Sequence, residues 1–272
     1  MKTYQTYLLD LDGVVWRGTT LLPGAIEFVS WLVTSGKQFR YLSNNSMISP
    51  AEVAERLRGF GLPATDAHVV TASSAAVALL AERFPNGRVW VTGLPSLRSM
   101  VARAELTVLN LHNGDAVDEP HTTAKDADVV LVGLDRTLTY AGLQQATRAL
   151  LNGAEFIAVN RDPQLPVEDG LDPGCGAILA ALETASRRTA TIVGKPSPLL
   201  LTEALNELHA DPKTAVMVGD ALEMDIAAGQ AAGIDTILVL SGITSSLQAE
   251  HATPPPTWIL RDLMDVLLAT TS

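Results

Sequence analysis

Apolar residues occur along this chain in short runs, and many of the runs end in glycine or in small polar residues. The first run, Thr6 to Leu9, leads directly into Asp10 and then into Asp12-Gly13. An apolar run of this length is typical of a buried strand, and Asp-Gly is a turn sequence. Helical patterns such as 25–35 separate the runs. This alternation of strands and helices predicts an α/β protein with a doubly wound parallel sheet.

The middle of the chain repeats the alternation with strands of its own. They are expected at 88–92, 129–132 and 156–159, with a helix at 140–151 between the last two. After them, apolar runs such as Thr191 to Val193 again end in glycine or polar residues and alternate with helical patterns, as in the first part of the chain. We therefore expect a second α/β unit in the middle of the chain.

The length and the charge of the chain narrow the possible functions. The 272 residues are enough for one large domain or two moderate ones, and 47% hydrophobic residues can fill a sizeable core. The net charge of −11 should repel nucleic acid and acidic membranes at long range. A local cationic pocket can still bind a phosphorylated metabolite.

Cysteine usage and hydropathy indicate the compartment. Cys175 is the only cysteine, so no intrachain disulfide is possible, which fits a reducing environment. No apolar run approaches the ~20 residues of a membrane span. The first strand begins so close to Met1 that no signal peptide is expected. The prediction is a soluble, cytoplasmic protein.

Four predicted strands end in residues that suit chemistry. These residues are Asp10, Ser43, Lys195 and Asp220, and Asp225 follows five residues after the last of them. Ligands of open parallel sheets bind beyond the carboxyl ends of the strands, so we expect these side chains to share one edge.

Together these residue types suit phosphate chemistry. Asp10 and Asp220, with a main-chain carbonyl, offer the hard oxygen ligands that Mg²⁺ prefers. Ser43 and the amides after it can donate to phosphate oxygens, and Lys195 can balance charge. An aspartate can act as nucleophile and form an aspartyl-phosphate, with Asp12 as general acid and base.

Each residue alone has a structural alternative. Ser43 fits a serine turn, Lys195 a solvated loop, Asp220 a turn and Asp225 a helix cap. The joint order of strand-end acid, hydroxyl, lysine and acid is much more specific than any single member.

These motifs resemble a known family. Asp10-Leu11-Asp12-Gly13-Val14 resembles the DxDG signature of haloacid dehalogenase (HAD) superfamily phosphatases, with Ser43, Lys195 and Gly219-Asp220 at the second, third and fourth motifs. The resemblance covers nearly the whole chain. It points to the NagD-like branch with a class IIA cap, which includes nitrophenyl phosphatase-like and phosphoglycolate phosphatase-like proteins, through these segments: 42–46, 132–135, 172–177 and 194–198.

The resemblance implies a role for each matched position. Asp10 is expected to be the nucleophile, and Asp12 the general acid and base. The metal ligands are expected to be Asp10, Asp220 and the main-chain carbonyl of Asp12, with Asp225 in support. The residues expected to hold the phosphoryl group are Gly13, Ser43, Asn44, Asn45 and Lys195.

The resemblance also implies two domains. Residues 1–79 and 187–272 would form the catalytic core, and 80–186 an inserted α/β cap. Arg161, where the branch often has proline, either lies on a surface turn or binds an anionic part of the substrate. Trp16, after the first motif, either contacts substrate or is a structural aromatic residue. Caps of this branch can dimerise, so a homodimer through the cap stays open.

We therefore predict a Mg²⁺-dependent phosphatase that hydrolyses a small phosphomonoester. Three alternatives stay open: a phosphotransferase to an alcohol acceptor, a non-catalytic protein that binds a phosphorylated ligand, and a phospho-receiver domain. Receiver domains are about half this length, which disfavours the last. The physiological substrate is left open.

Overall fold

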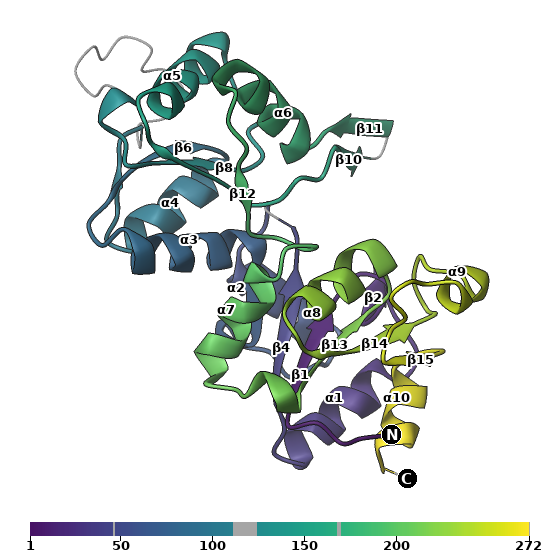
Figure 1. Cartoon of the computed structure of the whole chain (residues 1–272). Helices are drawn as coiled ribbons and strands as arrows, with labels where there is room; N and C mark the ends of the chain where they lie inside the picture. The colour runs from purple at the N-terminus through teal and green to yellow at the C-terminus, as the bar shows by residue number, and fades with distance from the viewer. Residues whose placement is uncertain (46, 111–123, 168–169, 272) are drawn as a thin grey trace. The chain divides into compact units, whose positions relative to one another are not determined.

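The computed structural model describes residues 1–45, 47–110, 124–167 and 170–271. They form two compact units, each with its own parallel sheet (Figure 1). The core unit consists of Met1–Ser43, Pro50–Thr71 and Lys195–Ser272, and the second unit of Asn44–Ser49 and Ala72–Gly194. The predicted α/β class, with two parallel sheets, is confirmed.

The core unit is built on a six-stranded sheet in the order β15-β14-β13-β1-β4-β5, and all its strands are parallel. The bounds are β1 (Thr6–Asp10), β4 (Gln38–Ser43), β5 (Val69–Thr71), β13 (Ala215–Gly219), β14 (Asp235–Val239) and β15 (Trp258–Leu260). Every residue of β1 is buried, as expected for a central strand covered on both faces. Burial of Leu8 and Leu9 contributes roughly 1.5–3 kcal/mol each, which anchors Asp10 at the end of the strand.

Helices join the strands of this sheet. They are α1 (Ala25–Thr34), α2 (Pro50–Gly59), α7 (Leu199–Leu208), α8 (Ala227–Ala231), α9 (Ser246–Glu250) and α10 (Leu263–Thr271), with shorter turns η1 (Asp66–His68), η3 (Pro212–Thr214) and the π-helical η4 (Leu222–Ile226). Helices α1 and α10 lie side by side (Figure 1). The amino terminus of Met1 donates to the carbonyl of Ala269 at 3.0 Å, which ties the two ends of the chain together.

A small hairpin follows β1, in the stretch that the sequence predicts as a loop or flap. Its strands are β2 (Trp16–Arg17) and β3 (Thr20–Leu21), with Trp16 opposite Leu21. Trp16 is buried in the core unit, whereas the tip of the hairpin is exposed. The hairpin therefore begins at a buried residue, Trp16, which lies four positions after Asp12 in the chain.

The second unit contains a five-stranded parallel sheet in the order β12-β9-β8-β6-β7. Its elements are α3 (Ala72–Arg83), β6 (Arg88–Thr92), α4 (Pro95–Arg103), β7 (Thr107–Val108), η2 (Ala124–Asp126), β8 (Val129–Val132), α5 (Tyr140–Leu151), β9 (Glu155–Ala158), hairpin β10 (Gln164–Val167) and β11 (Gly170–Pro173), α6 (Cys175–Ser186) and β12 (Thr191–Ile192). Helices α5 and α6 pack over one hydrophobic core with β8 and β9. Cys175 lies in this core, and burial raises the pKa of its thiol to about 12.

One predicted strand belongs to a different sheet from the one expected. The sequence predicts that the run Thr191 to Val193 ends at the same edge of the same sheet as β1. Instead, β12 pairs in parallel with β9, with Thr191 opposite Ile157, in the second unit. After the second unit, the chain returns to the core unit at Lys195. Lys195 therefore follows the last strand of the second sheet.

None of the described helices combines the length and the apolarity that a membrane crossing requires.

Candidate active site

Three of the predicted residues lie at the carboxyl edge of the core sheet. Asp10 is the last residue of β1, Ser43 is the last residue of β4, and Asp220 follows β13 directly. Strands β4 and β13 are the two neighbours of β1, and all three run in parallel, so their ends meet at one edge. All three side chains are buried.

Lys195 reaches the same edge and makes two short ion pairs. Its Nζ donates to Oδ1 of Asp10 at 2.5 Å and to Oδ1 of Asp225 at 2.6 Å, and the residue is only 4% exposed. Burial by itself would lower the pKa of the ammonium group. The two carboxylates outweigh that effect and raise the pKa of Lys195 above its usual value. The two carboxylates therefore favour the charged form of Lys195.

Asp225 is held from both sides. One oxygen accepts from Lys195, and the other, Oδ2, accepts from the backbone N–H groups of Asp220 at 3.0 Å and Ala221 at 3.1 Å. The short π-helical turn η4 brings Asp225 back to the end of β13. Gly219 is required there, because a Cβ would lie 2.1 Å from the Cβ of Asp225. Asp225 thus fixes both Lys195 and the backbone that carries Asp220.

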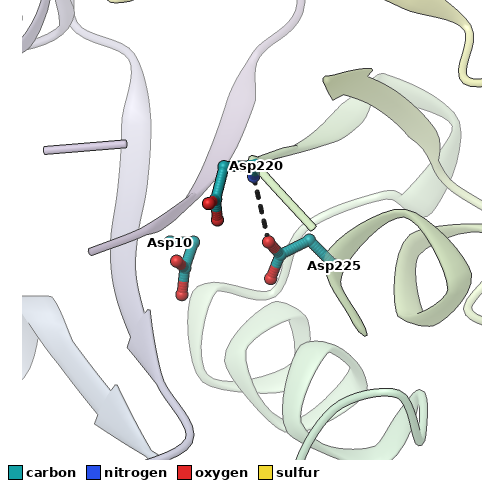
Figure 2. A group of neighbouring side chains, drawn as sticks. All are labelled: Asp10, Asp220 and Asp225. Carbon is teal, nitrogen blue, oxygen red and sulfur yellow. Dashed lines mark hydrogen bonds between the residues drawn. The ribbon is translucent and has the colours of Figure 1, made fainter. Parts of the chain in front are cut away.

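Asp10, Asp220 and Asp225 turn their carboxylates toward a shared space (Figure 2). One oxygen from each lies within 4.8 Å of the others. Burial raises the pKa of Asp220 to about 6, with the carboxylate of Asp225 adding to the rise and the backbone N–H of Ile243 opposing it. Burial also raises the pKa of Asp10, against the effect of Lys195.

The charge balance of this group fits a divalent cation. Three buried carboxylates face one buried ammonium, so two negative charges are not compensated within the group. Buried charges need a partner or a metal ion. Carboxylate oxygens at this spacing are the hard donors that bind Mg²⁺. The residues present therefore suit the metal that the sequence predicts.

Gly13 and the segment after β14 shape the site next to Asp220. Gly13 has φ +84°, and a Cβ there would lie 2.3 Å from Oδ2 of Asp220. Ser241 Oγ donates to the Gly13 carbonyl at 2.8 Å, and the N–H of Ile243 donates to Asp220 Oδ2 at 2.8 Å. The motifs predicted from the sequence do not include this segment. The sequence does carry a signal here, because the apolar run that ends at Leu240 is followed by the small residues Ser241 and Gly242, as at the ends of the other strands.

Asp12 lies after the strand end and is exposed, while Trp16 beside it is buried. The indole Nε1 of Trp16 donates to Oδ1 of Asp12 at 2.8 Å. Of the two interpretations of Trp16, neither foresaw this contact, because the sequence does not show where the hairpin turns its side chains.

The remaining predicted residues belong to the second unit. The carbonyl of Asn44 accepts from Asn160 Nδ2 at 2.9 Å, and Asn45 Oδ1 accepts from the N–H of Met47 at 2.8 Å. Arg161 is exposed and makes a paired contact to Glu183 on α6, at 2.9 and 2.6 Å. The group that the structure brings together in the core unit is thus Asp10, Gly13, Ser43, Lys195, Asp220 and Asp225.

Comparisons with known proteins agree on one family. Residues 7–107 match the family described as haloacid dehalogenase-like hydrolase, and residues 192–266 match one described as HAD-hydrolase-like. An acid sugar phosphatase of Staphylococcus saprophyticus is 35% identical over 98% of both chains. The structure is similar to a p-nitrophenyl phosphatase from Archaeoglobus fulgidus, with a TM-score of 0.87 and 33% identity over 98% of this chain and 100% of that one. It is also similar to NagD from E. coli K-12, with a TM-score of 0.85 and 31% identity over 96% and 98% of the two chains.

Proposed function

The chain belongs to the haloacid dehalogenase-like hydrolases and is a phosphatase of small phosphomonoesters, and we propose that it works through a phosphorylated Asp10. The observation that carries this proposal is the strand-end carboxylate of Asp10, buried and held by the ammonium of Lys195 at 2.5 Å. Such a carboxylate has a fixed direction and a lysine ammonium group beside it. A carboxylate held in one direction is positioned to attack, and the neighbouring ammonium favours its ionised form.

The first step transfers the phosphoryl group to the enzyme. A carboxylate oxygen of Asp10 attacks phosphorus, and the bond from phosphorus to the leaving oxygen breaks. Asp12 gives its proton to that oxygen, so the alcohol leaves neutral. General acid catalysis of this kind is typically worth about 10²–10⁴-fold.

The second step returns the enzyme to its starting state. Asp12, now a carboxylate, takes a proton from water, and the water oxygen attacks phosphorus. The bond between phosphorus and Asp10 breaks, which releases inorganic phosphate and restores the Asp10 carboxylate. The exposed position of Asp12 supports this role, because it can exchange protons with both the leaving group and water.

Mg²⁺ would be held by Asp10, Asp220 and the main-chain carbonyl of Asp12, and when bound it supplies positive charge for the phosphoryl oxygens. Lys195 adds a second positive charge beside Asp10. Asp225 keeps Lys195 and the Asp220 backbone in place. Most of the rate enhancement would then come from positioning and charge, as is usual for phosphoryl transfer.

We assign binding of the phosphoryl group to Gly13, Ser43, Asn44, Asn45 and Lys195. Residues 80–186, which make up most of the second unit, would act as a cap that excludes water and selects the substrate. Arg161 of this unit would contact an anionic part of the substrate. Names of relatives, such as acid sugar phosphatase, support sugar phosphates as the first substrates to test.

The decisive test is phosphate release with Mg²⁺ across a panel of sugar phosphates, glycerol phosphate, phosphoglycolate, nucleotides and pyridoxal phosphate. Asp10→Asn should lower kcat by at least about a thousandfold on every substrate, because the nucleophile is removed. Asp235→Asn is the matched control. It makes the same change in the core unit at the other end of a strand, where the carboxylate pairs with Lys2.

Turnover that survives in Asp10→Asn would overturn the mechanism. No turnover in the wild type on any substrate would favour a protein that binds phosphorylated ligands without catalysis. Adding glycerol as an acceptor separates hydrolysis from phosphotransfer, since a transferase would form a new phosphomonoester in place of inorganic phosphate.

A further inference from the structure

The hydrogen bond from Trp16 to Asp12 has no part in the mechanism above, and it involves the residue that moves the protons. The indole N–H donates to Oδ1 of Asp12 at 2.8 Å. An indole offers a single donor and no acceptor, so it can only donate to the carboxylate. It donates to Oδ1 of Asp12 and leaves Oδ2 without this contact.

Backbone contacts around Asp12 fix where the side chains of Asp12 and Trp16 begin relative to each other. Asp12 and Trp16 form an isolated bridge, and the N–H of Gly13 donates to the carbonyl of Trp16 at 2.7 Å. The N–H of Trp16 donates back to the carbonyl of Leu11 at 3.1 Å. These backbone hydrogen bonds stabilise the turn after β1, so the backbone position of Trp16 is fixed relative to Asp12.

Side chains of α2 and the residue after it hold the indole ring. The guanidinium Cζ of Arg56 lies 4.2 Å from the centre of the Trp16 ring, and one of its nitrogens donates to the carbonyl of Gly18 in the hairpin. The ring of Phe60 lies 5.9 Å from that of Trp16. Trp16 is only 2% exposed. Cation–π contacts of this type contribute about 0.5–2 kcal/mol, so the ring is packed and does not swing freely.

We propose that Trp16 is a positioning residue for proton transfer: its indole N–H holds Oδ1 of Asp12, so that Oδ2 carries the proton to the leaving group. This inference rests on the role of Asp12 in the proposed function. The indole suits both halves of the reaction. Oδ1 can accept the hydrogen bond when Asp12 is a carboxylate and also when Asp12 is protonated on Oδ2.

Such a role should depend on the leaving group. An alkoxide leaves poorly without a proton, so hydrolysis of glycerol phosphate needs a well-placed acid. p-Nitrophenolate is a stable anion and leaves without help from an acid. The parameter kcat/KM reports the steps up to phosphorylation of Asp10. It therefore separates loss of proton positioning from general damage to the site.

The experiment compares Trp16→Phe with wild type on these two substrates, with Mg²⁺ present. Phenylalanine keeps an aromatic ring next to Arg56 and removes the N–H donor together with part of the indole ring. We expect kcat/KM to fall about 10- to 100-fold on glycerol phosphate and less than about threefold on p-nitrophenyl phosphate. Trp258→Phe is the matched control. It removes another indole hydrogen bond in the core unit, to Tyr4 at 3.0 Å, and should change neither value.

Equal losses on both substrates, or no loss on either, would overturn the proposal. Asp12→Asn provides the benchmark, since it should show the same split between substrates with a larger loss. If Trp16→Phe does not fold, Arg56→Met replaces it, because this change loosens the indole ring without removing its N–H donor. The loss of kcat/KM should then again be larger on glycerol phosphate than on p-nitrophenyl phosphate, by a smaller factor. Failure of the whole mechanism is distinguishable, because Asp10→Asn would then retain turnover.

Discussion

The two units each contain a cation held by carboxylate oxygens, and the two arrangements differ in burial and balance. In the core unit, Lys195 is buried among carboxylates that outnumber it. In the second unit, Arg161 is exposed and faces one carboxylate, Glu183, through two parallel hydrogen bonds. Arg161 in turn lowers the pKa of Glu183.

The two groups differ in net charge. In the second unit, one arginine and one glutamate cancel each other and solvent screens the pair, so the pair has no charge left for a ligand to balance. The group in the core unit keeps uncompensated negative charge away from water, which is costly unless a cation binds. A buried group of charges that do not cancel is therefore a stronger indication of a functional site than a single charged residue at the end of a strand.

Removing the cation from each arrangement should give the largest contrast. Lys195→Met leaves two close carboxylates buried without their ammonium, and loss of one partner of a buried pair typically costs about 3–5 kcal/mol. Arg161→Met, the matched change, should cost about 0–1 kcal/mol. Urea denaturation at pH 8 with EDTA gives the free energy of unfolding of both variants. Equal losses would contradict the comparison.

The loss in Lys195→Met should shrink as the pH falls from 8 toward 5. Without the ammonium, the pKa of Asp10 should be raised further above its unfolded value, because burial and Asp225 both act in that direction. A group whose pKa is raised on folding binds protons more tightly in the folded state, so lower pH stabilises that state. Arg161→Met should show no such dependence between these pH values.

Much of this site could be predicted from local sequence. Asp10 and Ser43 end their strands, and Asp220 follows its strand directly, because a switch from apolar to small polar residues marks where burial ends. The placement of Lys195 could not be predicted fully. A run as short as Thr191 to Val193 does not say which sheet it joins, since pairing with β9 is decided by contacts distant in sequence. The bond from Trp16 to Asp12 depends on side-chain direction, which the pattern of residues does not contain.

Mg²⁺ should stabilise the core unit by a smaller amount than removal of Lys195 destabilises it. A ligand at a hundred times its Kd adds about 2.7 kcal/mol to the free energy of unfolding. Asp220→Asn should lose this gain and, with EDTA, should be at least as stable as wild type, because a crowded charge is gone. Glu183→Gln is the control and should keep the full response. An undiminished Mg²⁺ effect in Asp220→Asn would remove Asp220 from the metal site.

The smallest effect is expected for Arg161 and substrate binding. If Arg161 binds a second anionic group of the substrate, it must give up part of its contact with Glu183, so the net gain is a difference between two similar pairs. Arg161→Met should then raise KM about two- to fivefold for phosphoglycolate, equivalent to about 0.4–1 kcal/mol. Glycerol phosphate, which has no carboxylate, should show no change. Arg136→Met, which removes another exposed arginine of the second unit from its pair with Asp172, is the control. A KM that is unchanged for both substrates would leave Arg161 as a surface partner of α6, and the roles of the core-unit residues do not depend on it.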